Sequence, residues 1–277
     1  MIIVKLKGGL GNQMFQIYTG ISYALDQKID YSFNDNFYRS NHPNTTPRGT
    51  YWDTIFKNIS KNMSNGKIGK EYVNHLQKSY NWYKLPVLKN ITLNGYFQSH
   101  KYFSHNIGKI NEILNIPEMQ AEIRLKYPYD YKNFCSIHVR LGDYKKYPEH
   151  HINLDKNYFL EALKMIFKIR GKKEYLVFYE AEDLGIVKEI IQHIEDQKIN
   201  NRITFKYIDT QIPDYEQLLI MSCCESHIIS NSSFSWWAAY LNNHPKKCVV
   251  RPSQWFGPKI KSKITDLCPT SWKIINV

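Results

Sequence analysis

The sequence predicts an α/β protein built from two lobes with a cleft between them. Short apolar runs alternate with segments of helical period, and turns rich in glycine or serine follow two of the apolar runs. Strands that alternate with helices form a mostly parallel sheet, and ligands bind at the carboxyl ends of its strands. The length of 277 residues accommodates one large domain or two small ones.

The N-terminal lobe is expected to span residues 1–130. Its predicted elements are the strand Ile2–Leu6, the helix Gln13–Leu25, the strands Ile29–Phe33 and Ile91–Phe97, and helical segments within Lys101–Lys126. From about 34 to 90 the pattern loosens, because asparagine, proline and glycine interrupt it. We expect contacts to a substrate in that stretch, although no motif there names one.

The C-terminal lobe, residues 131–277, follows a boundary at Tyr127–Asn133. Its predicted strands are Phe134–Val139, Tyr175–Tyr179, Ile203–Ile208, His227–Ser230 and Cys248–Val250. Its predicted helices are Asp155–Ile169, Asp183–Ile194 and Asp214–Cys223. Asp155 is expected to cap the first of these helices, because its side chain can accept from unpaired backbone N–H groups.

Composition excludes several classes of protein. Hydrophobic residues at 43% and charged residues at 22% are typical of a folded globular chain and exclude intrinsic disorder. No apolar run approaches the roughly 20 residues of a membrane helix, and the start of the chain does not resemble a signal peptide. The five cysteines are odd in number and lack zinc spacing, so we expect reduced thiols in a cytoplasmic protein.

The formal net charge of +12 makes nucleic acid a candidate partner, which we rank last. The basic residues are dispersed, and their densest stretches, Lys57–Lys78 and Lys259–Lys263, match no DNA-binding motif. The charge fits a solvated face equally well. It also fits attraction to phosphorylated or membrane-bound substrates, so peripheral membrane contact stays open, as does the oligomeric state.

A glycine-rich segment follows the first predicted strand, at Gly8–Gln13. Gly9 and Gly11 would let backbone N–H groups approach a ligand, and the helix that follows favours negative charge at its start. The segment lacks the Gly-Lys-Ser/Thr of a P-loop, and a tight strand-to-helix turn is the alternative. The amides of Asn12 and Gln13 favour a polar ligand.

A second segment combines three polar side chains at the end of a predicted strand. Strand alternation places His138 and Arg140 on one face, with Asp143 just beyond the end. Arginine offers a planar fork for phosphate, and Asp143 could hold that fork in place. A structural Arg–Asp pair beside a buried histidine is the alternative.

The third segment joins a strand to a helix through small polar residues. Asn231, Ser232 and Ser233 precede the helix, and hydroxyls together with its exposed N–H groups form an anion site without a metal. Phe234 and the two tryptophans after it are expected to pack the helix against the sheet. The three segments together predict a site for a nucleotide or a sugar-nucleotide diphosphate, with Arg140 and helix dipoles neutralising the leaving group.

At these residues the sequence resembles the α-1,2-fucosyltransferases of glycosyltransferase family 11. The stretches GGLGNQMF, HVRLGDY and SNSSFSWWAAYL match three family motifs in the family order, and KKCVVRPSQWF looks like the family's closing strand and loop. The matches extend from residue 8 to about residue 256.

The resemblance implies a GT-B-like fold of two facing Rossmann-like lobes and an inverting glycosyltransferase that needs no metal or other cofactor. It would move L-fucose from the donor GDP-β-L-fucose to the 2-hydroxyl of a galactose-containing glycan acceptor. By resemblance, Arg140 binds the diphosphate of the donor. The resemblance implies that the other donor-binding residues of the same lobe are His138, Ser232, Ser233 and Phe234. From the opposite lobe it implies Gly9, Gly11, Asn12 and Gln13.

The chain departs from the family at three places. Leu141 replaces a second arginine, Glu180 lies where the family has Ser-Asp-Asp, and Gln217 occupies the place of an acidic residue that contacts guanine. A different GDP- or UDP-linked sugar therefore stays open. A sugar- or nucleotide-binding module without catalysis stays open as well.

Transfer requires a stabilised leaving group and an oriented acceptor hydroxyl. Arg140 is the catalytic cation that we expect. Asp143 and Glu149 are the nearest carboxylates in the sequence, and Asp143 is our candidate for the acceptor side. A dissociative reaction through an oxocarbenium-like state needs no dedicated base.

Overall fold

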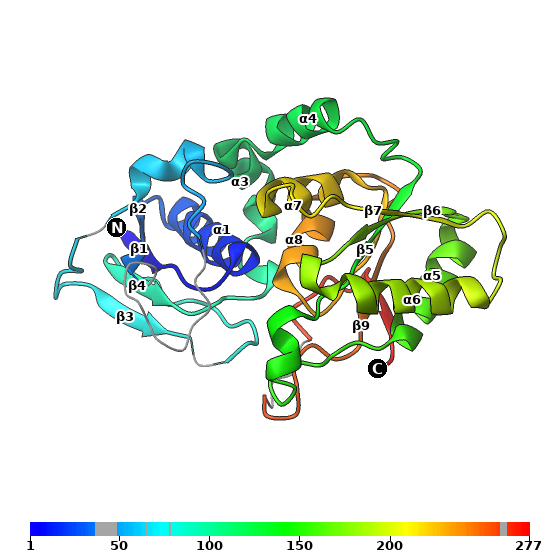
Figure 1. The fold of residues 1–277 in the computed structure, drawn as a ribbon. Coiled ribbons are helices and arrows are strands. Elements are labelled where there is room, and N and C mark those ends of the chain that lie inside the picture. Colours follow the sequence, from blue (N-terminus) through cyan, green and yellow to red (C-terminus); the bar gives the residue numbers. More distant parts are fainter. Residues whose placement is uncertain (37–48, 65, 78, 261–264) are drawn as a thin grey trace. The chain divides into compact units, whose positions relative to one another are not determined.

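The computed structural model describes residues 1–277 except 37–48, 65, 78 and 261–264, and except the side chains of residues 143 and 146 (Figure 1). The chain divides into two compact units. Unit 1 comprises Met1–Met119 with Ser262–Pro269, and unit 2 comprises Gln120–Lys261 with Thr270–Val277. The C-terminal segment therefore contributes to both units.

Unit 1 is built on a parallel sheet with the strand order β2-β1-β4-β3. The strands are β1 (Ile2–Lys5), β2 (Tyr31–Asn34), β3 (Val73–Leu76) and β4 (Ile91–Asn94). Three of them were predicted. β3 lies in the stretch for which the sequence pattern was weak, because its residues are mostly exposed and show no apolar alternation.

Helix α1 (Leu10–Gln27) covers one face of this sheet and is almost entirely buried. It approaches β1 closely at Gly20, where an added Cβ would lie 2.4 Å from a methyl carbon of Val4. Helix α3 (Ile107–Leu114) packs against α1. The other described helical elements of unit 1 are η1 (Lys57–Asn62), η2 (His100–Tyr102) and η3 (Ser104–Asn106). Helix α4 (Ile116–Lys126) begins in unit 1 and continues into unit 2.

Unit 2 is built on a parallel sheet of six strands with the order β10-β9-β8-β5-β6-β7. The strands are β5 (Phe134–His138), β6 (Glu174–Phe178), β7 (Thr204–Tyr207), β8 (Ser226–Ile228), β9 (Val249–Pro252) and β10 (Lys273–Ile275). From β5 the chain proceeds to β6 and β7 on one side, and from β8 to β9 and β10 on the other. The order therefore reverses between β5 and β8.

The helices of unit 2 form two packed pairs. Helices α5 (Lys156–Arg170) and α6 (Leu184–Asp196) pack on each other, as do α7 (Asp214–Cys223) and α8 (Ser233–Leu241). The main core joins α5 and α6 to the central strands, with Ile137, Val177 and Ile228 fully buried. The predicted cap is confirmed, because the carboxylate of Asp155 accepts from the backbone N–H groups of Asn157 and Tyr158.

Candidate active site

The strands β5 and β8 are hydrogen-bonded neighbours, with Ile137 paired to Ile228 in register. The chain leaves both strands at the same edge of the sheet, through residues 139–141 on one side and 229–233 on the other. This edge is the carboxyl end of a parallel sheet at the point where the strand order reverses. Open α/β sheets bind their ligands at this place.

Ser230 joins the two strand ends. Its hydroxyl donates to the carbonyl oxygen of His138 at 2.5 Å and accepts from the backbone N–H of Arg140 at 3.2 Å. The side chain is fully buried. The second and third sequence segments are thus held together by Ser230, which belongs to the predicted polar cluster of the third segment.

Arg140 presents a guanidinium group that is mostly buried, with 14% of the side chain exposed. It forms an ion pair with Glu180, which follows β6, and its guanidinium carbon lies 5.1 Å from the ring centre of Tyr144. Sequence reasoning expected Asp143 to hold this arginine. The side chain of Asp143 lies outside the described part of the structure, so this expectation stays a prediction. Among the described side chains, Glu180 forms an ion pair with Arg140.

The loop after Arg140 is held by Asp183, at the start of α6. One carboxylate oxygen of Asp183 accepts from the backbone N–H of Gly142 at 2.8 Å, and the other accepts from the amine of Lys145 at 2.5 Å. Gly142 has φ +33°, and an added Cβ there would collide with the Glu180 carboxylate at 1.8 Å. The loop therefore requires glycine at this position, both for its backbone and for the approach of Glu180.

His138 is buried beside Phe234, with a ring-centre separation of 5.5 Å. Burial, and to a smaller extent the charge of Arg140, lowers the pKa of His138 to about 3. The imidazole is therefore neutral at physiological pH. Its Nδ1 atom is buried and has no hydrogen-bond partner among the described residues.

Ser232 is the N-cap of α8. Its hydroxyl accepts from the backbone N–H of Phe234 at 3.3 Å, while Ser233 and Phe234 are half-buried at the first positions of the helix. The two tryptophans that follow, Trp236 and Trp237, are fully buried, as predicted. Phe234 contacts the sheet at the end of β5, where its ring lies against His138.

Asn231 and Gln217 are engaged within the protein. The amide nitrogen of Asn231 donates to the carbonyl oxygens of Ile152 and Trp255, each at 3.0 Å, and so joins two loops. The amide nitrogen of Gln217, on α7, donates to the carbonyl oxygen of Ile212 at 2.7 Å. The neighbouring Glu216 accepts from the amine of Lys126 at 2.8 Å.

The glycine-rich segment in unit 1 is a tight turn into α1. Gly8 has φ +81°, and a Cβ there would lie 2.5 Å from the amide nitrogen of Asn12. The amide of Gln13 donates to the carbonyl oxygens of Gly8 at 3.2 Å and Gly49 at 3.1 Å. Gly9 is the N-cap residue of α1, and the space beside its Cα is open, whereas Gly11 is buried.

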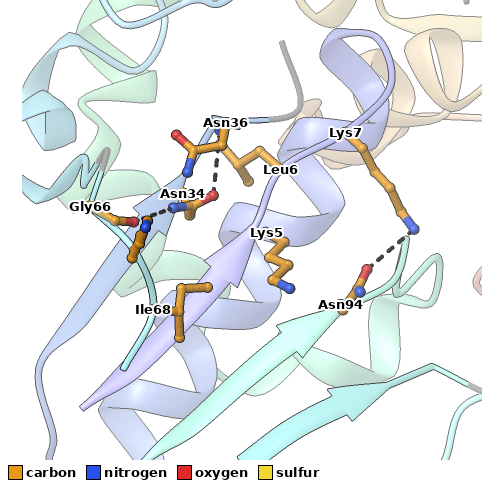
Figure 2. A pocket seen from close by; sticks show the side chains of 9 residues that line it. Lys5, Leu6, Lys7, Asn34, Asn36, Gly66, Ile68 and Asn94 are labelled. Carbon is orange, nitrogen blue, oxygen red and sulfur yellow. Dashed lines mark hydrogen bonds between the residues drawn. The ribbon is translucent and has the colours of Figure 1, made fainter. Parts of the chain in front are cut away.

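Unit 1 also contains a cavity that the sequence did not suggest (Figure 2). Its volume is about 630 Å³, and it lies at the carboxyl ends of β1, β2 and β4. Its polar lining comes from Lys5, Lys7, Lys67, Asn34, Asn36 and Asn94.

A family model for glycosyl transferase family 11 matches residues 1–276. The chain belongs to glycosyltransferase family 11. The resemblance predicted from the three sequence segments is confirmed, and the protein is a glycosyltransferase.

Several family 11 relatives align over nearly the whole chain. An O-antigen biosynthesis glycosyltransferase (WbnK) of Escherichia coli is 28% identical, over 94% of this chain and 96% of its own length. An alpha-1,2-colitosyltransferase of Escherichia coli is 25% identical over 98% of both chains. A galactoside 2-alpha-L-fucosyltransferase of Caenorhabditis elegans is 24% identical over 99% of this chain and 78% of its own length.

The α/β fold of this family 11 enzyme is GT-B-like, as predicted. The solved structure of ADP-heptose LPS heptosyltransferase II from Escherichia coli superimposes with a TM-score of 0.51 at 10% identity, covering 99% of this chain and 89% of the other. Among the described residues, no three histidine, cysteine or acidic side chains cluster as a metal site would require. None of the helices in the described ranges is long and apolar enough to cross a membrane.

Proposed function

We propose that the enzyme transfers L-fucose from GDP-β-L-fucose to the 2-hydroxyl of a galactose-containing glycan, forming an α-1,2 linkage with inversion and without a metal ion. The observation that carries the proposal is the position of Arg140 at the reversal of strand order, where its backbone N–H is bonded to Ser230 in the segment that leads into α8. A guanidinium group and a helix N-terminus both favour a diphosphate. The names of the two α-1,2-transferring relatives favour the sugar and the linkage.

Arg140 would stabilise the departing GDP. A guanidinium has five N–H donors, so one edge of Arg140 can stay on Glu180 while the others reach phosphate oxygens. The first N–H groups of α8, near Ser233, would add a fixed positive potential without reorganisation. As the bond to the anomeric carbon breaks, negative charge moves onto the diphosphate, which these groups hold.

The acceptor hydroxyl would lose its proton as it attacks the anomeric carbon from the opposite side. Asp143 is our candidate for the group that orients this hydroxyl and takes the proton. Glu149 is less suited, since its carboxylate accepts from the amine of Lys259 at 2.8 Å, and this hydrogen bond lowers the pKa of Glu149. By resemblance, Gly9, Gly11, Asn12 and Gln13 would contribute to the donor site from unit 1.

The test uses purified enzyme, GDP-fucose and a β-galactoside acceptor, with GDP release and product linkage measured together. Arg140→Ala should reduce turnover by a factor of about a hundred or more, since charged stabilisation of a leaving group is worth several kcal/mol. EDTA should leave the rate unchanged. Arg140→Lys keeps the positive charge but loses the planar group that can donate two parallel hydrogen bonds to a phosphate, so we expect an intermediate rate. Unchanged turnover in Arg140→Ala would refute the diphosphate role.

A second donor is favoured by one observation, the relative that is named an alpha-1,2-colitosyltransferase. Colitose is the 3-deoxy form of L-fucose, so the two sugars differ by one hydroxyl group. A competition between GDP-fucose and GDP-colitose, with UDP-sugars as controls, decides between them. A site that binds the 3-hydroxyl through a buried partner should reject the deoxy sugar strongly, whereas an apolar site would not.

A further inference from the structure

We propose that the cavity in unit 1 binds an acidic sugar through its carboxylate or phosphate group, and that this sugar is a unit of the acceptor glycan. The first part depends only on the cavity. The second part rests on the function proposed above.

Strand register places three polar side chains on one face of the sheet. Lys5 ends β1 and is paired in register with Asn34 of β2 on one side and Asn94 of β4 on the other. Residues paired in this way in a parallel sheet point to the same face. Val4 points to the opposite face, where it meets Gly20 of α1, so Lys5 and the two asparagines face away from α1.

The cavity has positive charge and no described carboxylate in its lining. Its three lysines are Lys5, Lys7 and Lys67, and none of the nine lining residues is acidic. The amine of Lys7 lies 3.5 Å from the amide oxygen of Asn94 and 4.8 Å from the ring centre of Tyr96. Burial, and to a smaller extent the charge of Lys5, lowers the pKa of Lys7, and an anion bound at these amines would offset the repulsion between the two lysines.

The wall of the cavity is held in place by Asn34, which is itself buried. Its amide nitrogen donates to the carbonyl oxygens of Ser64 at 3.3 Å and Gly66 at 3.4 Å. Its amide oxygen accepts from the backbone N–H of Asn36 at 3.4 Å. These bonds join the end of β2 to the segment that carries Lys67 and Ile68, so the basic groups belong to a built cavity.

The size and chemistry of the cavity fit a sugar with an anionic substituent. A volume of about 630 Å³ lies within the range of about 300–1,000 Å³ typical of small-molecule sites. The amide of Asn36 and the apolar side chain of Ile68 can meet the polar and apolar sides of a sugar ring, and the lysines can meet its charge.

The test compares three forms of one sugar on the whole chain: galactose, galacturonate and galactose 6-phosphate. Binding is followed by ligand-observed NMR and thermal shift without donor. The double variant Lys5→Met/Lys7→Met keeps the aliphatic stems and removes two charges. We expect it to weaken binding of the charged sugars by about tenfold or more and to leave galactose unchanged.

Two matched variants identify the site. Lys109→Met removes one exposed charge from α3, which packs against α1, and it should bind the charged sugars as the wild type does. Arg140→Ala removes the guanidinium group that we propose for the donor site in unit 2, and it should also leave binding of the charged sugars intact. A preference for galacturonate or for galactose 6-phosphate assigns the anion as carboxylate or phosphate. Melting temperatures without ligand show whether the Lys5→Met/Lys7→Met fold is intact.

Three results would overturn the proposal: equal affinity for all three sugars, unchanged binding in Lys5→Met/Lys7→Met, or loss of binding in Arg140→Ala. The acceptor role is tested separately by transfer to galactosides with and without an acidic neighbour. There Lys5→Met/Lys7→Met should raise the KM for the acidic acceptor alone and leave kcat and the donor KM unchanged. If charged sugars bind but GDP-fucose is not used, the donor assignment fails while the cavity site stands.

Discussion

Replacing Asp183 tests whether the loop after Arg140 is held by one buried carboxylate. The Asp183 side chain is 0% exposed and accepts from the Gly142 N–H at 2.8 Å and from the Lys145 amine at 2.5 Å. In Asp183→Ala the N–H of Gly142 stays buried without a partner, which costs about 1–3 kcal/mol. The Lys145 side chain is 41% exposed, so its ion pair with Asp183 contributes at most about 1 kcal/mol.

The expected loss in the free energy of unfolding is therefore about 1–4 kcal/mol, or a fall in Tm of roughly 2–16 °C for a unit of this size. Asp183→Asn is the matched control, because its amide oxygen can still accept from Gly142. Asp183→Asn should lose only the stabilisation that comes from the ion pair with Lys145. Calorimetry gives the Tm and the free energy of unfolding of both variants. The KM for the donor should also rise in Asp183→Ala, because the loop begins directly after Arg140.

The reasoning would be refuted if Asp183→Ala melted within about 1 °C of the wild type, or if the alanine and asparagine variants were equally destabilised. The first result would mean that the loop N–H finds another partner at no cost. The second would mean that charge, and not the hydrogen bond to Gly142, is the dominant contribution.

Two further changes test the cap of α8 and the buried histidine. Ser232→Ala removes the acceptor for the Phe234 N–H and should lower the free energy of unfolding by about 1 kcal/mol, measured by denaturant titration, whereas Ser232→Asn, which can still cap, should not. The ordinary pKa of a histidine is 6.5, and burial lowers the pKa of His138 to about 3 in the folded protein. As pH falls from about 6.5 toward 3, this imidazole is therefore protonated in the unfolded chain but not in the folded one. His138 should lower the stability across that window by up to about 1.4 kcal/mol per pH unit, and His227, whose pKa burial also lowers to about 3, should add a similar slope. His138→Asn should therefore make the total slope shallower, and an identical slope in the variant would contradict a buried neutral imidazole.

Local patterns were enough to predict most elements of unit 2. The helix expected at Asp214–Cys223 has those bounds, and Asp155 caps α5 as expected. Apolar periodicity and capping depend on residues within a few positions of each other, so the sequence displays them directly. The strands β3 and β10 were not predicted, because they are short and mostly exposed and form through pairing with β4 and β9.

The candidate site was predicted in part. The sequence indicated Arg140 and the serine cluster as neighbours of a diphosphate, and the structure joins these segments through Ser230. It did not indicate that Glu180 would pair with Arg140. These two residues are forty positions apart, and their contact depends on β5 lying beside β6.

By itself the amino-acid sequence determined the family, the alternation of strands and helices, and the three segments that carry the chemistry, because each is a pattern of near neighbours. The tertiary structure alone decided the strand order that reverses between β5 and β8, the partners of Arg140 and Gly142, and the basic cavity of unit 1. These depend on which strands become neighbours, and that choice is made by packing between residues far apart in the chain. Lys5, Asn34 and Asn94 face one cavity only because three parallel strands end in register.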